Sequence, residues 1–364
     1  MVINDKNGQC DDIQSEEGSK QGDVPAMAMY AIETRPLLNR LQEVVAQRLC
    51  KQVWYADDSS SGGKIDEMKK WWDELCKEGP KYGYFPKACK TVMIVKDPAL
   101  LQHAIDAFGT EIAIGIEGER HLGAVIGNLD FKELYVSKKI EKWVSDVEQL
   151  SEIAAKEPQI ALAAFTNALC MRWCFVQRTI SGIKHLFEPL ENSIREKLIP
   201  AIVGRSVSDI ERRLLALPVR FGGIGIQNPV DTADNEYKTS VKITEPLKRL
   251  IFNQESTLEN LDEDQVKKII SQSKQNKEKR LTQEMESVKS QLGNDQKRYL
   301  ELAQEKGSGA WITALPIQSL GYVLNRQEFR DSLCLRYGWK IPNTPQFFAC
   351  GKKNSVDHAI ICMN

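Results

Sequence analysis

Two adjacent carboxylates, Asp57 and Asp58, lie in the stretch QVWYADDSSSGG, residues 52 to 63. They follow a run of strand-forming residues and precede a Gly-Gly pair, a pattern that predicts a hairpin with both acids at its tip. Carboxylates fixed on a rigid turn can hold divalent ions, which activate an attacking hydroxyl and neutralise a leaving phosphate. Asp is also common in solvated turns, because its side chain bonds to nearby backbone. The stretch is therefore either a polymerase-type metal hairpin or a polar surface turn.

A second candidate for metal chemistry is the C-terminal stretch FFACGKKNSVDHAIICMN, in which Cys350, His358 and Cys362 form a Cys-x7-His-x3-Cys array. The His–Cys spacing suits a zinc knuckle, whose Zn²⁺ takes four ligands. Three local ligands do not close such a site, so a further donor would be needed. The sequence favours a metal-free tail over a zinc site.

Composition limits the class of protein. The chain has 364 residues and is 42% hydrophobic, enough for two or three domains with sizeable cores. Its net charge of −1, from 49 basic and 50 acidic residues, argues against a strongly basic nucleic-acid binder judged on overall charge. Nine irregularly spaced cysteines and no leader-like apolar start favour a reduced intracellular compartment, cytoplasmic or nuclear. We expect no membrane partner, because no apolar run approaches the roughly 20 residues that a span needs.

Mixed strands and helices are expected around the acids, and helices alone after Phe131. Residues 1–20 are polar and lack periodicity, which favours disorder. The elements expected up to residue 126 are a kinked helix over 24–49, strands over 52–55 and 59–61, a helix over 65–77, and strands over 91–96, 111–116 and 121–126. Farther on, helices are expected over 139–155, 159–181 and 183–198.

Basic residues recur on the helices expected between residues 160 and 220. They are Arg172, Arg178, Lys184, Arg195, Lys197, Arg205, Arg212, Arg213 and Arg220. A basic helical face binds nucleic-acid phosphates through counterion release. Glutamates interleave with these cations, so a merely solvated face is the alternative, with nearly equal weight.

Several blocks, taken in order, resemble the reverse transcriptase of non-LTR retrotransposons. SEEGSKQGDVPAMAMYAI matches a Ser-x-x-Gly-x-x-Gln-Gly core at Ser15, Gly18, Gln21 and Gly22, which in that family supports template and nucleotide. Next, YADD resembles the third polymerase motif. The resemblance implies that Tyr55 contacts nucleotide or template and that Asp57 and Asp58 are catalytic ligands of Mg²⁺ or Mn²⁺.

Downstream blocks extend this resemblance. GPKYGYFPKACKT resembles the fourth motif, in which Lys90 would protonate the departing pyrophosphate. RHLGAVIG resembles the primer grip, with Leu122, Gly123 and Gly127 near the primer, although a plain hairpin explains these glycines too. LPVRFGGIGIQNP, residues 217–229, resembles a block that follows the thumb of these elements.

The resemblance implies an α+β, helix-rich fold with a partial polymerase palm of β-hairpins, an all-helical thumb and a small C-terminal module. The expected regions are a disordered start (1–14), palm (15–130), thumb (131–249), a charged helical or disordered insertion (250–306) and the terminal module (307–364). The expected partners are an RNA template with a DNA primer, or an RNA–DNA duplex.

Activity is a separate question from family. The family's first catalytic Asp motif and its fingers would precede the Gln-Gly loop, so we interpret the sequence as N-terminally truncated and expect no polymerisation by this chain alone. The alternative function is noncatalytic nucleic-acid binding by a retroelement-derived protein. A helical scaffold that binds protein through residues 250–306 is a third hypothesis, supported by composition only.

Overall fold

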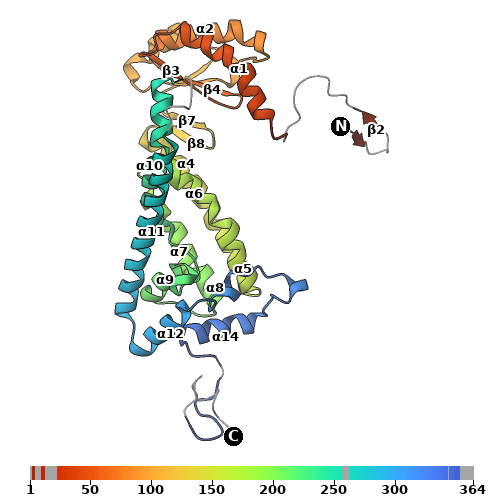
Figure 1. Cartoon of the computed structure of the whole chain (residues 1–364), viewed down its shortest axis with the longest axis vertical. Helices are drawn as coiled ribbons and strands as arrows, with labels where there is room; N and C mark the ends of the chain where they lie inside the picture. Colours follow the sequence, from red (N-terminus) through yellow and green to blue (C-terminus); the bar gives the residue numbers. More distant parts are fainter. Residues whose placement is uncertain (1, 5–9, 13–22, 256–261, 343, 353–364) are drawn as a thin grey trace. The chain divides into compact units, whose positions relative to one another are not determined.

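The structure is a computed structural model that describes the chain except residues 1, 5–9, 13–22, 256–261, 343 and 353–364. It divides into two compact units, described separately below. Unit 1 comprises Met1–Ile116 and Leu247–Leu261, and unit 2 comprises Glu117–Pro246 and Asp262–Asn364. Helices dominate, and the strands form small two-stranded sheets (Figure 1). The expected helix-rich α+β class is confirmed at this level.

Unit 1 alternates short strands with helices. Its elements are β1 (Val2–Asn4), β2 (Cys10–Asp12), α1 (Ala26–Glu43), β3 (Cys50–Tyr55), β4 (Asp58–Gly63), α2 (Ile65–Glu78), β5 (Val92–Ile94), α3 (Leu101–Phe108) and β6 (Ala113–Gly115). The helix expected over 24–49 is α1, which continues through Pro36. The helix expected over 65–77 is α2, which presents an apolar face to the unit.

Two small clusters form the core of unit 1. The first joins α1, β3 and α2 and consists of Leu37, Leu41, Cys50, Trp71 and Leu75. The second joins the start of α2 to the strands and α3 and consists of Ile65, Met93, Val95, Ala104 and Ile112. Helix α2 contributes to both clusters, so it connects the β3–β4 hairpin to the parallel pair of β5 and β6.

One expected strand is wrong. Residues 121–126 were predicted to be extended, but Leu122 and Gly123 form the turn between β7 (Gly118–His121) and β8 (Ala124–Gly127). Both turn residues have positive φ, 47° and 81°. Such values suit a two-residue hairpin turn, because its backbone twist matches that of the flanking strands. Periodicity alone does not reveal this turn, whereas the hairpin interpretation of RHLGAVIG agrees with it.

In unit 2 the β7–β8 hairpin is followed by helices. They are α4 (Leu129–Ala154), α5 (Pro158–Ala164), α6 (Met171–Thr179), α7 (Glu188–Ser193), α8 (Ile199–Val203), α9 (Asp209–Ala216), α10 (Pro229–Asn253), α11 (Glu263–Gln291), α12 (Asn294–Gln304), α13 (Ala310–Thr313) and α14 (Arg326–Tyr337). Two π-helical turns, Phe165–Leu169 and Ile194–Leu198, interrupt the α-helical runs. Figure 1 shows the short helices α7 and α9 between the long helices α4 and α11. The last two turns of α10, from Leu247, belong to unit 1.

A single large cluster forms the core of unit 2, with aromatic rings at its centre. Trp143 lies 6.0 Å from Trp173 and 6.4 Å from Phe187 between ring centroids. The charged region that was expected to be helical or disordered is helical in its described part, and Met285 and Val288 of α11 join this cluster. Their burial stabilises a helix whose other positions are mostly charged or polar.

One helical stretch, Pro158–Thr179, is long and apolar enough to cross a membrane by length and composition alone. Its side chains Ala161, Phe165, Trp173 and Val176 belong to the hydrophobic cluster of unit 2. The stretch therefore matches a core helix of this unit, although the sequence pattern had suggested no such candidate.

Candidate functional site

Asp57 and Asp58 lie at the tip of the β3–β4 hairpin in unit 1. Strands β3 and β4 pair antiparallel with Tyr55 opposite Asp58, so the turn consists of Ala56 and Asp57 alone. Ala56 has φ 54°, a left-handed conformation that costs a residue with a Cβ of the order of 1 kcal/mol. The expected hairpin with both acids at its tip is confirmed, and its turn is strained.

Both acids are exposed, and no ion pair or hydrogen bond joins their side chains to another described residue. Tyr55 beside them is 68% exposed, which is unusual for a large ring on a strand. The tip therefore presents two carboxylates and an aromatic ring to solvent. No neighbouring described cation neutralises these carboxylates.

The two carboxylates match the oxygen ligands that Mg²⁺ and Mn²⁺ prefer, but they supply only part of a coordination shell. Among the described residues, no group of three or more His, Cys, Asp or Glu side chains is placed to bind a metal ion. A cation at the tip would therefore need water, phosphate or another ligand to complete its shell.

Gln52 fixes the strand that leads to the tip. Its Oε1 accepts hydrogen bonds from the indole N–H groups of Trp54 at 3.2 Å and Trp71 at 3.0 Å. Its Nε2 donates to the Leu38 carbonyl at 2.9 Å, which connects β3 to α1. The sequence predicts a strand at Gln52 but no role for its side chain. No local pattern reveals that role, because the bonding partners come from three separate elements.

Two tyrosines lie around the hairpin. The Tyr84 hydroxyl is 2.7 Å from Ser59 Oγ, and its ring centroid is 5.0 Å from that of Trp54. Burial raises the pKa of Tyr30 on α1, and the neighbouring Tyr84 and Asp57 raise it further. Tyr30 therefore stays a neutral phenol at physiological pH.

The loop before β3 depends on a buried acid. The Glu67 carboxylate of α2 receives a hydrogen bond from Lys70 Nζ at 2.6 Å and another from the Ala46 N–H at 2.7 Å. The Lys70 ammonium, and then the Ala46 amide, lower the pKa of Glu67. Beside it, burial and the Glu67 charge raise the pKa of Cys50 to about 11. The Cys50 thiol therefore packs in the core of unit 1 and is not a nucleophile at neutral pH.

None of the other predicted metal-site or nucleotide-site residues that the structure describes bonds to the two acids through its side chain. Lys90 is exposed at the end of a 3₁₀ turn, Ala88–Lys90, and no bond connects it to the acids in the described structure. Ser15, Gly18, Gln21 and Gly22 lie outside the described residues. The same holds for His358 and Cys362, so only Cys350 of the predicted zinc array is described.

The second hairpin, β7–β8 of unit 2, contains the predicted primer-grip residues. At its turn, the Gly123 carbonyl accepts a hydrogen bond from the Tyr135 hydroxyl of α4 at 2.9 Å. A Cβ added at Gly123 would lie 3.4 Å from the Phe175 ring. Leu122, at the tip, is 45% exposed.

Gly127 has a local explanation. It pairs with Gly118 across the hairpin, and a Cβ there would lie 2.5 Å from the Glu117 carbonyl oxygen. Backbone packing within the hairpin thus requires glycine at this position. The observation supports the plain-hairpin interpretation of Gly127 and leaves Leu122 as the exposed residue of the three.

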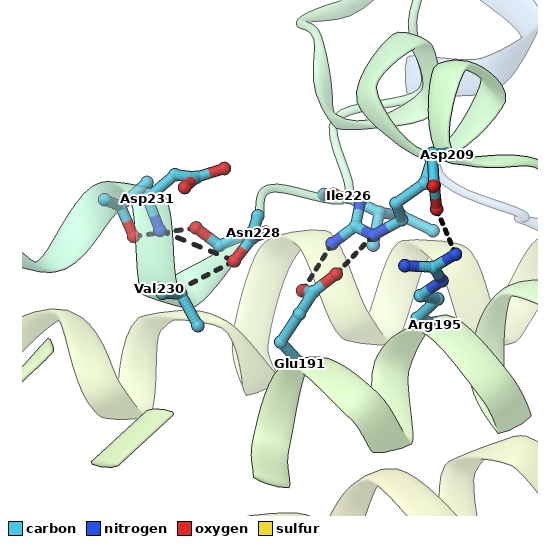
Figure 2. A network of polar contacts seen from close by, with 9 residues as sticks. Glu191, Arg195, Asp209, Ile226, Asn228, Val230 and Asp231 are labelled. Atoms are coloured by element: carbon cyan, nitrogen blue, oxygen red, sulfur yellow. Dashed lines mark hydrogen bonds and ion pairs between the residues drawn. The ribbon is translucent and has the colours of Figure 1, made fainter. Parts of the chain in front are cut away.

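The basic residues expected on the helices between 160 and 220 are mostly paired with acids of their own unit. The described pairs are Arg172–Asp146, Arg178–Glu236, Arg195–Asp209, Lys197–Glu148, Arg205–Glu211, Arg212–Glu191, Arg213–Glu284 and Arg220–Glu278. Figure 2 shows the Arg195–Asp209 pair and the Glu191 carboxylate with two bonds. These contacts favour the solvated-face alternative for this region, since the paired charges neutralise one another.

Unpaired cations lie instead on α4. Lys132, Lys139 and Lys142, together with Tyr135, follow helical spacing along one side of α4, and we call this set the α4 basic stripe. Lys139 Nζ lies 5.1 Å from the centroid of the Tyr135 ring. Within the part of the chain that the structure describes, no carboxylate pairs with these lysines. Since Tyr135 bonds to Gly123, the stripe begins at the tip of the β7–β8 hairpin.

Comparisons with known protein families, with curated proteins and with solved structures found no match for this chain. The two hairpins and the charges around them are therefore the features that bear on function.

Proposed function

We propose that the protein is reverse-transcriptase-like, and that its Asp57–Asp58 tip binds a divalent cation beside the phosphates of a nucleic acid. The observation that carries this proposal is the tip itself. Of its two exposed carboxylates, neither with a described cation partner, Asp57 lies in the strained two-residue turn and Asp58 directly follows it. Backbone strain of this kind clusters at ligand-binding and catalytic positions.

Asp57 and Asp58 would hold the cation, and a bound Mg²⁺ or Mn²⁺ would neutralise phosphate charge. The exposed Tyr55 ring offers a stacking surface for a base or sugar, and ring stacking tolerates any base. Two protein carboxylates do not complete a two-metal centre, so we expect cation-dependent binding without nucleotide addition by the described residues.

The test compares the purified chain with an Asp57→Asn/Asp58→Asn variant on an RNA template annealed to a DNA primer. We expect Mg²⁺ or Mn²⁺ to strengthen binding of the duplex to the chain and to have little effect on the variant. Primer extension should be absent from both. Equal cation response in the two proteins would refute a role for the tip, and template-dependent extension by the chain would refute the expected lack of activity.

The α4 basic stripe supports a second candidate function, noncatalytic nucleic-acid binding by unit 2. Lys132, Lys139 and Lys142 are unpaired among the described residues, and Tyr135 and the partly exposed Phe175 add rings near the hairpin tip. Basic residues with interspersed rings suit a nucleic-acid backbone and its unstacked bases. This function would not need the carboxylates, so the double Asn variant would bind as the natural chain does.

A further inference from the structure

The residue that follows α10 closes one edge of the β3–β4 hairpin. The Gln52 N–H donates to Gln254 Oε1 at 3.0 Å, and Gln254 Nε2 donates to the Gln52 carbonyl at 2.9 Å. A glutamine amide carries a donor and an acceptor, as a peptide group does. The Gln254 side chain therefore takes the place of a neighbouring strand at this point of β3.

Hairpin register explains why Gln52 is the residue reached. In a two-residue hairpin the closing pair, Tyr55 and Asp58, exchange hydrogen bonds, and bonded pairs then alternate along the strands. Val53 bonds inward to β4, whereas the main chain of Gln52 faces outward. Gln254 bonds to both outward groups of this one residue.

Local structure fixes the orientation of Gln254. It has φ 56°, and its main-chain carbonyl accepts a hydrogen bond from Gln42 Nε2 on α1 at 3.1 Å. Its Nε2 also donates to the Ile251 carbonyl at 2.7 Å. One residue from Gln52, the Lys51 ammonium lies 5.1 Å from the centroid of the Phe252 ring. Several interactions therefore hold Gln254 and its neighbours against β3 and α1, so the contact between Gln254 and Gln52 does not depend on one exposed hydrogen bond.

We infer that Gln254 is a positioning residue for the Asp57–Asp58 tip. Gln254 fixes the main chain of Gln52 from outside, while Trp54, Trp71 and the Leu38 carbonyl fix the Gln52 side chain. Three residues farther along β3 the strand reaches Tyr55 and the strained Ala56 turn. The inference rests on the proposed cation-binding role of the tip, and it assigns control of that tip to Gln254, which is 202 positions from Gln52 in sequence.

The decisive variant is Gln254→Glu, which keeps the size of the side chain. Its ionised carboxylate can still accept from the Gln52 N–H but repels the Gln52 carbonyl. Once protonated, the introduced carboxyl can donate to that carbonyl, so acidification should restore the pair of bonds. Asn253→Asp is the matched control, because it adds the same charge at an exposed neighbour with no described bond to β3. Gln254→Ala removes both bonds at every pH.

Two measurements separate this inference from the proposed function. The first is the NMR amide shifts of residues 56 to 58 near pH 4, below the ordinary pKa of a glutamate carboxyl of about 4.3, and near pH 7, each compared with the natural chain at the same pH. The second is the affinity for Tb³⁺, a hard cation whose luminescence a nearby tyrosine or tryptophan sensitises, with Asp57→Asn/Asp58→Asn defining the signal from the tip.

For Gln254→Glu we expect shifted tip amides and an affinity at least about threefold weaker near pH 7, both returning toward the values of the natural chain near pH 4. Gln254→Ala should differ from the natural chain at both pH values, and Asn253→Asp at neither. Tip amides in Gln254→Glu that match those of Asn253→Asp at both pH values would overturn the inference. If the amides respond as expected while the double Asn variant binds Tb³⁺ as the natural chain does, the proposed function fails and the positioning role stands.

Discussion

Arg212 and Glu191 form a buried two-bond ion pair between α9 and α7. The Arg212 Nε and Nη2 atoms each lie 2.7 Å from a carboxylate oxygen of Glu191, and Nη1 donates to the Ile226 carbonyl at 2.7 Å. Arg212 is 4% exposed and is thus unavailable to a phosphate. The pair connects α9 to α7 and to the glycine-rich segment that precedes α10 (Figure 2).

Removing one partner of this pair should destabilise unit 2 strongly. Glu191→Gln leaves a buried guanidinium without its counter-charge, and such changes cost about 3–5 kcal/mol. Urea denaturation followed by tryptophan fluorescence measures the loss. The control is Arg195→Met, which breaks the exposed Arg195–Asp209 pair and should cost about 1 kcal/mol or less. Similar losses in the two variants would show that the buried pair is not a main contributor to stability.

Ala56→Gly should stabilise the hairpin. Glycine adopts the left-handed φ of 54° without a Cβ penalty, so we expect a gain of up to about 1 kcal/mol in the free energy of unfolding. Ala31→Gly is the matched change at an exposed site inside α1 and should cost about 0.5–1 kcal/mol. Chemical denaturation compares the two variants, and a loss of stability in Ala56→Gly would contradict strain at the turn.

Alkaline pH should weaken the fold partly through Cys50. Burial, with the Glu67 charge, raises the pKa of Cys50 from 9.0 to about 11 in the folded chain, whereas the unfolded thiol ionises near its ordinary value. The unfolded state therefore loses this proton first, and the free energy of unfolding should fall as pH rises from 9 to 11.

Cys50→Ala tests this pH dependence. Denaturation midpoints measured from pH 8 to pH 11 should fall less steeply for Cys50→Ala than for the natural chain. Cys89→Ala, at an exposed site, should retain the natural slope. An unchanged slope in Cys50→Ala would exclude this thiol as a source of the alkaline loss.

If unit 2 binds nucleic acid, the unpaired lysines should account for the salt dependence of binding. Lys139→Gln/Lys142→Gln should weaken binding to an RNA–DNA duplex and reduce the steepness of its salt dependence, because two fewer counterions are released. Lys197→Gln, at a lysine already paired with Glu148, should have the smaller effect. Fluorescence anisotropy over a salt series measures both slopes, and equal slopes would argue against the α4 basic stripe.

Local pattern predicted the elements but not the bonds between them. The β3–β4 hairpin and α2 were recoverable because alternation, turn residues and an amphipathic face each occur within a dozen residues. The strand predicted over 121–126 missed the turn at Leu122–Gly123, since periodicity gives no sign of positive φ at a leucine, although the hairpin interpretation of RHLGAVIG placed a turn in this stretch. The role of Gln52 depends on Leu38, Trp71 and Gln254, which only the folded chain brings to it.

Charge was the least predictable property. Counting cations between residues 160 and 220 suggested a basic face, but their acidic partners include Asp146, Glu236 and Glu284 from outside that range. In the sequence, glutamates such as Glu133 and Glu141 lie between the lysines of α4. Only the folded structure shows that the cations between residues 160 and 220 are mostly paired, whereas Lys132, Lys139 and Lys142 of α4 have no described carboxylate partner.

Helix α10 also affects how the protein can be cut into fragments. Its residues up to Pro246 belong to unit 2 and its last two turns to unit 1, so unit 1 is discontinuous in sequence. A fragment that ends at Ile116 would lack Gln254 and would leave the outward amide and carbonyl of Gln52 without their described partner. Producing an intact hairpin therefore requires residues 247–255 to be supplied, either through a designed linker or as a separate peptide.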